Sequence, residues 1–371
     1  MKKILHIPNY YPPHTGGIEQ VCYMSVRALE SSQNKVICFN DTNKTVQDVY
    51  EGVEINRVGI VGKLASQPLS ISYFWQLRKI LKQYKPDIIH FHVPNPLVSL
   101  YLLLLIPNKV KLIVHYHAEI LTSKLIYTCY RPLEKLLFER ANTIIATSPK
   151  LRDEAEPLYK FKDKCLILAN AIDTNHLELT EADRVKVINL KKRYNNKKII
   201  LTFGRHVPYK GLKYLLEAES NISNDAVIIV GGSGPLTQEL KSLTSSDRVH
   251  FVGRIPDDEL KVYLHAADVF AFPSVTKAEA FGLALAESMY CYTPPVTFTI
   301  PASGVNYVSL HGETGLEVEN SNAIAFANAI NKLLDDDNLR CTMGKNSHNR
   351  VVANFSIETY NKNINEIYKV L

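Results

Sequence analysis

The sequence predicts an α/β protein of two domains, each with helices packed around a parallel β-sheet. The chain has 371 residues, more than the roughly 250–300 at which a single core stops growing. Short apolar runs alternate with segments of helical periodicity, which is typical of parallel sheets. A strand, a glycine loop and a helix follow one another near the start of the chain and again in its second half.

Composition narrows the class of protein. Apolar residues make up 46% of the chain and charged residues 22%, as in ordinary globular proteins. The net charge is +6, without a block of like charges. That argues against a nucleic-acid partner and leaves acidic ligands or an anionic membrane surface open. The six cysteines form no Cys-x-x-Cys pair, which indicates buried thiols in a reducing compartment.

No segment predicts secretion or insertion into a membrane. The apolar run that starts at Ile4 stops at His6 and Pro8, too early for a signal peptide. The longest apolar run, residues 97–106, is about half of what a bilayer span needs. We expect a cytoplasmic protein whose positive charge leaves peripheral contact with the inner face of the plasma membrane open.

The first half alternates strands and helices. Its first strand, Lys3–Ile7, leads into a loop with Gly16 and Gly17 and then into a helix over residues 21–29. Adjacent glycines at a helix entrance let backbone N–H groups approach a phosphate, and the alternative is a simple tight turn. Further strands are predicted over residues 36–40, 53–58, 88–91, 111–115, 143–147 and 165–168, with a helix over 70–84.

Histidines gather where two of these strands end. His117 follows the strand over residues 111–115, and ligands of open α/β sheets bind beyond the carboxyl ends of strands. A histidine in the run from His115 to Glu119 is therefore well placed for a ligand, and a structural histidine is an equally good interpretation. His90 and His92 end another strand with no third ligand at metal-binding spacing, so we interpret them as cleft lining or core and predict no metal site.

Basic and apolar residues interleave over residues 123–140, which predicts a helix pair interrupted by Pro132. Lys124, Arg131, Lys135 and Arg140 supply the charge. We favour amphipathic helices that pack on the sheet. The alternative is a basic face that binds a membrane surface.

A polar stretch, residues 174–198, separates the halves, and then the plan restarts. Strands are predicted over residues 199–203, 226–230 and 249–252, and helices over 212–219 and 256–266. The last helix, about residues 356–371, has an apolar face that can reach back across the first domain. We predict one domain at 1–170 with 356–371 and another at 171–355.

Residues 267–289 predict the ligand site. A strand, Val269–Phe272, leads into a loop with Glu279 and then into a helix from about Phe281. Gly282 falls in the first turn, where backbone N–H groups are free to bind an anion, and Glu287 lies further along the helix. The alternative is a helix with ordinary surface acids.

Arg205 and Lys210 flank a strand-to-helix loop that we expect at the same mouth. Two cations beside a helix N-terminus suit a diphosphate. Bonds that strengthen as charge builds on a departing diphosphate also lower a barrier. The acids at 335–337 lie between two helical patterns, which favours a solvated turn over a metal-binding motif.

These residues resemble those of a known family. Arg205 with Lys210, and the run from Glu279 to Glu287, are similar to the R-x4-K and E-x7-E motifs of retaining nucleotide-sugar glycosyltransferases of family 4. The resemblance spans essentially the whole chain and includes residues 16–19, 117–119, 131–149, 231–235 and 303–304. It implies the GT-B fold, in which two Rossmann-like domains, the first for the acceptor and the second for the donor, face a central cleft.

The resemblance also implies roles for individual residues. Arg205 and Lys210 would bind the donor diphosphate, Glu287 the ribose, and Glu279 the transferred sugar, which His117 would contact near its reacting carbon. Backbone amides and loop residues would complete the donor site: Gly16, Gly17, Gly204, Gly232, Ser233, Gly234, Arg254, Phe281, Gly282 and Leu283.

The implied reaction transfers a hexose with retention of configuration and needs no metal or other cofactor. We find no side-chain nucleophile, so our hypothesis is same-face attack in which the departing phosphate takes the proton of the acceptor. Ser233 and the run Tyr292-Thr293-Pro294 depart from the family pattern, which bears on the preferred base and sugar.

The segments at 117–119, 131–149 and 303–304 are most similar to bacterial mannosyl- and hexosyltransferases of O-antigen or capsule assembly. We therefore favour GDP-mannose over a UDP-hexose, with a lipid-linked glycan as acceptor. Two other functions stay open on the same fold. A nucleotide-sugar epimerase would need an acid/base pair in the first domain, which we do not identify. The third possibility is a non-catalytic subunit that binds a nucleotide sugar. The presence of both phosphate-binding cations and both glutamates argues against it.

Overall fold

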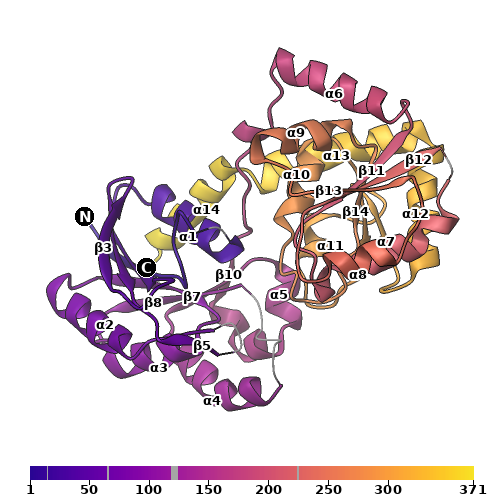
Figure 1. Cartoon of the computed structure of the whole chain (residues 1–371). Helices are drawn as coiled ribbons and strands as arrows, with labels where there is room; N and C mark the ends of the chain where they lie inside the picture. The colour runs from indigo at the N-terminus through magenta and orange to yellow at the C-terminus, as the bar shows by residue number, and fades with distance from the viewer. Residues whose placement is uncertain (15, 65–66, 118–123, 224) are drawn as a thin grey trace. The chain divides into compact units, whose positions relative to one another are not determined.

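The computed structural model describes residues 1–14, 16–64, 67–117, 124–223 and 225–371. The chain divides into two units (Figure 1). Unit 1 comprises Met1–Asn170 and Tyr360–Leu371, and unit 2 comprises Ala171–Thr359.

Unit 1 is built on a sheet that has eight strands within the described residues, in the order β10-β9-β8-β7-β1-β2-β4-β3. Neighbouring strands are parallel except for the edge strand β3, which is antiparallel to β4. These strands are β1 (Lys3–Ile7), β2 (Gln33–Phe39), β3 (Val46–Tyr50), β4 (Val53–Val58), β7 (Ile88–Val93), β8 (Lys111–Tyr116), β9 (Thr143–Ala146) and β10 (Cys165–Ile167). Strands β5 (Gly62–Leu64) and β6 (Gln67–Leu69) form a separate antiparallel pair.

Helices cover both faces of this sheet because its central strands are buried on both sides. On one face, strand residues such as Leu5 and Phe91 form a core with Tyr73, Leu102 and Phe138 of three helices. The helices of unit 1 are α1 (Gly17–Ala28), α2 (Ser72–Gln83), α3 (Pro96–Leu105), α4 (Lys124–Arg140), α5 (Pro149–Glu154) and the 3₁₀ segment η1 (Glu156–Lys164), followed at the C-terminus by α14 (Ile357–Lys369). Helices α1 and α14 cover the other face.

The C-terminal helix α14 packs against α1, and Figure 1 shows it in yellow beside the indigo α1. The Tyr360 hydroxyl lies 2.7 Å from the Ser25 hydroxyl. The Asn365 amide donates to the Ala28 carbonyl at 3.0 Å. These contacts follow from the apolar face of α14, which buries Tyr360, Ile364, Ile367 and Tyr368. The prediction that the last helix returns to the first half of the chain is confirmed.

Several predictions need correction. The segment predicted as a helix pair is one helix, α4, with Pro132 inside it. The connection from β2 to β4 is the antiparallel strand β3 and not a helix. Cys129 and Cys341 are exposed, whereas the other four cysteines are buried thiols. Among the described residues, no helix is both long enough and apolar enough to cross a bilayer.

Unit 2 is built on a parallel sheet with the order β13-β12-β11-β14-β15-β16 among its described residues. The strands are β11 (Lys198–Phe203), β12 (Ala226–Gly231), β13 (Val249–Gly253), β14 (Val269–Phe272), β15 (Pro295–Phe298) and β16 (Leu316–Val318). The helices are α6 (Glu181–Arg193), α7 (Leu212–Ala218), α8 (Thr237–Ser242), α9 (Asp257–Ala266), α10 (Leu283–Tyr290), α11 (Val305–Val308), α12 (Ala323–Asp335) and α13 (Asp337–Asn354), with 3₁₀ turns η2 (Asn175–Leu177), η3 (Pro208–Lys210) and η4 (Glu219–Asn221). Figure 1 shows α9, α10 and α13 on one face of this sheet and α7 and α12 on the other.

The polar stretch predicted to separate the halves forms helix α6, inside unit 2. The helix begins with a capping box, in which Thr180 and Asp183 each bond the other's backbone N–H. Such a box satisfies two of the N–H groups that a helix start leaves free. Lys261 also forms an ion pair with Asp183 at 2.6 Å, which holds α6 against α9. The stretch is therefore part of the fold of unit 2 and does not act as a linker.

The loops after β11 and β12 pack backbone to backbone. Gly232 has φ +103°, and a Cβ on it would lie 1.9 Å from the Gly204 carbonyl oxygen. Gly253 also has a positive φ, +73°, but a Cβ there would meet nothing within 4 Å. Alanine at Gly253 would therefore cost only the left-handed backbone conformation. Alanine at Gly232 would cost that conformation and a steric clash as well.

We predict that Gly253→Ala lowers the free energy of unfolding by about 1–2 kcal/mol, the cost of a left-handed residue. Gly232→Ala should cost about 3 kcal/mol or more, because the clash adds to the strain. Urea unfolding of both variants measures the difference. If both variants lose the same free energy of unfolding, the clash at Gly232 adds no cost. The close approach of the two loops would then not stabilise the fold.

Candidate active site

Three loops meet at the carboxyl edge of the unit 2 sheet because β11 lies between β12 and β14. Phe203 is in register with Gly231, and Leu201 with Phe270. The strands therefore end side by side, and the loops that follow them share one edge. This is where open α/β sheets bind ligands.

A small pocket at this edge brings Arg205 and Lys210 together. It is lined by Thr202, Phe203, Gly204, Arg205, Lys210, Leu212, Phe272, Pro273 and Ser274. A Cβ on Gly204 would lie 3.9 Å from the Lys210 ammonium, so the cation lies against bare backbone. The Arg205 side chain is exposed at the same pocket. Arg205 and Lys210 thus border one mouth, as the sequence indicated.

Glu279 forms an ion pair with Lys210, and both side chains are mostly buried, at 11% and 16% exposure. The Ser274 hydroxyl donates to the same carboxylate oxygen at 3.0 Å. The Lys210 ammonium also lies 5.1 Å from the centre of the Phe272 ring. Lys210 is therefore held between a carboxylate and an aromatic ring, with little freedom to swing into solvent.

A second buried serine fixes the loop that carries Glu279. The Ser303 hydroxyl donates to the Glu279 carbonyl, and the Gly304 N–H donates to the Ala280 carbonyl at 2.8 Å. Ser274 and Ser303 were not among the predicted site residues. Ser303 lies within a segment of the family resemblance. However, no spacing along the sequence indicates that its hydroxyl would bond the backbone of Glu279.

Helix α10 begins at Leu283, two residues later than predicted. Gly282 is the residue before the helix and not part of its first turn, because its φ of +88° is left-handed. No side chain caps the helix start. The Phe281 ring packs edge-on against Phe355 at 5.4 Å, so the residue offers only its backbone to the loop. Phe281, Gly282 and Leu283 thus lie at a helix start that no side chain caps.

Glu287 is a half-buried carboxyl on α10. Burial raises its pKa from 4.5 to about 7, and the negative charge of Asp257 adds to the rise. Arg254 lies at the end of the edge strand β13, 81% exposed and 3.9 Å from Asp257. Arg254 does not line the pocket that holds Arg205 and Lys210, so the structure does not bring all the predicted donor residues into one pocket.

The loop after β12 packs on the loop after β11. The His206 N–H donates to the Ser233 carbonyl at 3.0 Å, and a Cβ on Gly234 would lie 2.5 Å from the His206 carbonyl oxygen. The Ser233 side chain is exposed. Gly232, Ser233 and Gly234 thus border the loop of Arg205 from the β12 side.

The remaining predicted residues belong to unit 1. Gly16 precedes α1 and Gly17 is its first residue. A Cβ on Gly17 would meet nothing within 4 Å, so there is open space in front of its backbone. His117 follows β8 and is buried. Its Nε2 lies 3.0 Å from His92 Nδ1, and burial lowers its pKa to about 3, which keeps the imidazole neutral.

The interpretation of His90 and His92 as core agrees with their complete burial, but a third imidazole lies near them that spacing along the chain did not indicate. Donor atoms of His90, His92 and His115 all lie within 4.8 Å of one another. His115 is opposite His92 in the register of β7 and β8, so the third side chain comes from the next strand. Spacing along the chain cannot reveal it. Burial holds the pKa of all three imidazoles well below its usual value.

The acids at 335–337 form a junction between α12 and α13, as predicted. Asp335 ends α12, and the Asp336 carboxylate caps α13 by accepting the Leu339 N–H at 2.9 Å. Asp337 forms an ion pair with Lys198 at 2.9 Å.

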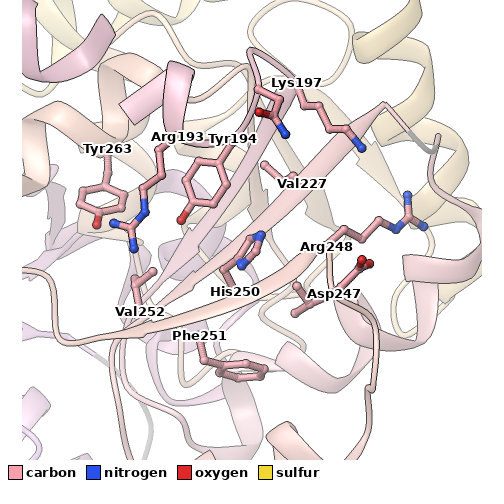
Figure 2. Close-up of a pocket in the computed structure, with 12 residues that line it drawn as sticks. Arg193, Tyr194, Lys197, Val227, Asp247, Arg248, His250, Phe251, Val252 and Tyr263 are labelled. Atoms are coloured by element: carbon pink, nitrogen blue, oxygen red, sulfur yellow. The ribbon is translucent and has the colours of Figure 1, made fainter. Parts of the chain in front are cut away.

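A wider pocket lies near the start of β13 (Figure 2). Figure 2 shows Arg193 and Tyr194 on one side of it, Asp247 and Arg248 on the other, and His250 between them. Arg248 is already bound to Glu219 and to backbone carbonyls of the adjacent loop. None of the predicted site residues lines this pocket, and half of its lining residues precede strands, whereas ligands of such sheets bind where strands end.

Two α/β units of this kind, the second carrying cations and glutamates at its carboxyl edge, are those of the GT-B fold. The comparisons with known proteins give the family. Residues 15–176 match the family described as Glycosyltransferase Family 4, and residues 185–350 match Glycosyl transferases group 1. The chain belongs to these glycosyltransferases.

Relatives and solved structures match along nearly the whole chain. A D-rhamnosyltransferase, WbpZ of Pseudomonas aeruginosa, is 28% identical over 94% of this chain and 91% of its own length. The O-antigen chain mannosyltransferase C of Escherichia coli is 26% identical over 96% and 95%. Sucrose-phosphate synthase of Thermosynechococcus elongatus superposes with a TM-score of 0.79 at 21% identity, covering 100% of this chain and 98% of its own. Anabaena HepE in complex with UDP-glucose superposes with a TM-score of 0.77 at 18% identity, covering both chains fully.

The raised pKa of Glu287 predicts a pH-dependent stability. Because the folded protein holds this proton more tightly than the unfolded chain does, the contribution is complete below pH 4.5 and is lost as the pH rises through about 7. Glu287→Gln removes this half-buried charge, so at pH 8 the variant should be more stable than wild type by about 1–3 kcal/mol. Near pH 4.5 the two should be equal. Thermal unfolding across this pH range tests the prediction, with the exposed Glu217→Gln as control. A variant that is less stable at pH 8 would contradict it.

Proposed function

We propose that this glycosyltransferase transfers a hexose, with mannose favoured, from a nucleotide-diphosphate sugar to a glycan of a bacterial surface polysaccharide. Unit 2 would bind the donor and unit 1 the acceptor. The relatives named as a D-rhamnosyltransferase and an O-antigen mannosyltransferase support a hexose donor and this class of product. The observation that carries the proposal is the buried Lys210–Glu279 pair beside the exposed Arg205.

The ion pair suits a site that must receive two more negative charges. Without substrate, Glu279 neutralises Lys210, which avoids an unpaired buried cation. A diphosphate entering beside Gly204 would attract Lys210 and Arg205. The Glu279 carboxylate would then be freed in part to accept hydrogen bonds from hydroxyls of the sugar. Ser274 keeps the carboxylate oriented during this exchange, because its hydroxyl donates to it.

The leaving group is the nucleoside diphosphate. As the bond from the sugar anomeric carbon to the diphosphate oxygen breaks, negative charge grows where Lys210 and Arg205 lie, so both cations bind the transition state more tightly than the donor. The acceptor hydroxyl forms its new bond on the same face, and its proton passes to an oxygen of the departing phosphate. Configuration is thereby retained. The neutral His117 would contact the sugar without competing for that proton.

Two cations and the uncapped start of α10 supply the positive potential that a divalent metal supplies in other enzymes, so no metal is required for this step. Glu287 would accept from the ribose hydroxyls. Its raised pKa means that nucleotide binding, which needs the carboxylate, strengthens as the pH rises through about 7.

The acceptor is proposed to be a lipid-linked glycan at the inner face of the membrane. Unit 1 offers an apolar and basic surface for peripheral contact, which we call the α2–α3 patch: Ile71, Trp75, Arg78, Lys79, Lys82 and Leu104. Its apolar members are 73%, 59% and 67% exposed. The Phe74 and Tyr101 rings meet edge-on at 5.4 Å, so α2 and α3 lie side by side. Exposed aromatic and basic side chains are typical of interfacial binding.

Donor binding and turnover test the central proposal together. With labelled GDP-mannose or UDP-glucose and a lipid-linked acceptor, wild type should give a glycosylated product in the presence of EDTA. Lys210→Ala and Arg205→Ala should each lower kcat by about 10²–10³, as for loss of a group that stabilises developing negative charge. Lys213→Ala, which removes an exposed lysine from the neighbouring helix α7, is the matched control.

Turnover within a few-fold of wild type in Lys210→Ala would rule out the leaving-group role. Donor binding without transfer to any acceptor would instead favour a nucleotide-sugar-binding subunit. Inversion of the anomeric centre in the product would contradict same-face attack.

Membrane contact has a built-in reporter, because Trp75 of the α2–α3 patch is the one tryptophan of the sequence. Its emission should shift to shorter wavelength when anionic vesicles are added at low salt, and the shift should reverse as salt screens the basic residues. Charge reversal at Lys79 and Lys82 should weaken the shift. Lys135→Glu on α4 tests the other basic helix. If the wavelength of maximum emission does not change when vesicles are added, this patch is excluded as the contact surface.

A further inference from the structure

Five histidines gather on one face of the unit 1 sheet: His6 of β1, His90 and His92 of β7, His115 of β8, and His117 just after β8. The register explains the cluster. His6 is opposite His90, and His92 is opposite His115, so alternate residues of three neighbouring strands point to the same face. All five are buried, and the first four are fully inaccessible. Such a density of imidazoles is unusual for a face that otherwise packs apolar helices.

A buried thiol joins this cluster from the helix above. Cys22 of α1 is fully inaccessible, and donor atoms of His6, Cys22 and His92 all lie within 4.8 Å of one another. A tetrahedral or trigonal ion at 2.0–2.3 Å from its ligands needs them about 3.3–4 Å apart. Closing the widest separation of 4.8 Å to this range needs a contraction of about 0.8–1.5 Å, which rotation of the side chains would have to supply.

The two histidines each keep one nitrogen without a partner. His6 Nδ1 and His92 Nε2 are buried and have no hydrogen-bond partner within the described part of the chain. Their other nitrogens are both engaged, His6 Nε2 with Asn34 Oδ1 at 3.1 Å and His92 Nδ1 with His117 Nε2 at 3.0 Å. An unpaired buried polar group is costly, so a ligand for these nitrogens would remove a penalty.

The surroundings fix which nitrogen of His6 carries the proton. The Asn34 amide nitrogen donates to the Leu29 carbonyl at 2.9 Å, which identifies the amide oxygen as the atom that faces His6. An oxygen only accepts, so His6 Nε2 must donate to it. His6 Nδ1 therefore holds a lone pair. A metal-binding histidine has this arrangement, with one nitrogen donating to an oxygen and the other free to ligate.

We propose that His6, Cys22 and His92 bind one transition-metal ion of the Zn²⁺ or Cu⁺ type in unit 1. Two imidazole nitrogens and one thiolate are ligands that such ions prefer over Mg²⁺ or Ca²⁺. Binding displaces the proton of the Cys22 thiol, which leaves the protein. A Cu⁺ thiolate is then neutral overall, which suits a site without exposure, whereas Zn²⁺ leaves one positive charge.

The other possible set, His90 with His92 and His115, fits less well. Both nitrogens of His90 are already engaged, Nδ1 with the Tyr368 hydroxyl at 2.9 Å and Nε2 with His115 Nδ1 at 3.2 Å. Ligation by His90 would break one of these bonds, whereas ligation by His6 and His92 breaks none.

A metal on His92 would also position His117. Ligation through Nε2 makes Nδ1 the protonated nitrogen of His92, which then donates to His117 Nε2. His117 is left with its own proton on Nδ1. Metal binding thus selects one tautomer of the residue proposed to contact the sugar. The metal proposal itself does not rest on the proposed function, because it concerns unit 1 contacts alone.

The full-length protein, purified without a histidine tag and with reductant, tests the proposal. Elemental analysis after growth with added zinc or copper should find about one ion per chain. Because the site is fully buried, the ion should resist brief treatment with EDTA. Refolding from urea with Co²⁺ as probe should give the near-ultraviolet absorption of a cobalt–thiolate bond. The more abundant element, Zn or Cu, decides between the two ions.

Cys22→Ala and Cys38→Ala form a matched pair, because both thiols are buried in the same apolar cluster and Cys38 is outside the proposed ligand set. Cys22→Ala should lose the bound ion and the cobalt–thiolate absorption, and Cys38→Ala should keep both. Wild-type protein that contains no more metal than Cys22→Ala overturns the proposal. Wild-type protein that refolds with Co²⁺ but shows no thiolate band overturns it even if Cys22→Ala does not fold.

Discussion

The candidate site depends on the position of β11 between β12 and β14. This order places three loops, each from a different part of the sequence, at one edge of the sheet. Lys210 reaches Glu279, 69 residues later, only because their strands are neighbours. The two side chains then satisfy each other's charge in a place that solvent hardly reaches, and Ser274 and Ser303 hold the carboxylate and its loop in position. Without that strand order, the same residues would be separate surface charges.

Unit 1 differs from unit 2 in how it buries polar side chains. Its buried imidazoles are neutral, whereas the buried Lys210 and Glu279 of unit 2 form an ion pair. Neutral imidazoles of β7 and β8 are stacked, with ring centres of His90 and His92 4.5 Å apart and those of His115 and His117 4.3 Å apart. Burial disfavours the charged form of each ring, which makes the stack compatible with an apolar interior. The two units therefore place their functional groups on similar sheets by different physical means.

Much of this architecture could be predicted from the sequence. The bounds of β1, β4 and β14 agree with their predictions because each is an apolar run stopped by polar or turn-forming residues. The two parallel sheets and the shared mouth of Arg205 and Lys210 follow from the alternation of strands, loops and helices, whereas the GT-B fold follows from the family resemblance. The roles of these residues stay predictions that the proposed assays address.

What the sequence could not reveal depends on contacts across strands or on backbone angles. The edge strand β3 is polar and largely exposed, so it has no apolar run to mark it. The start of α10 depends on the left-handed φ of Gly282, which sequence periodicity does not contain. The partnership of His92 with His115 and Cys22 comes from strand register and helix packing, and no spacing along the chain encodes either. Nothing in the sequence around Ser274 indicates that its hydroxyl donates to Glu279.

The return of α14 to unit 1 has a consequence for how the chain is made in the cell. The strands of unit 1 are synthesised before unit 2, but the helix face that covers His90 and packs on α1 is synthesised after it. Throughout translation of unit 2, the sheet of unit 1 lacks this cover and exposes apolar and imidazole side chains. Unit 1 can therefore complete its fold only after unit 2 has been synthesised, and until then chaperones would have access to the uncovered face of its sheet.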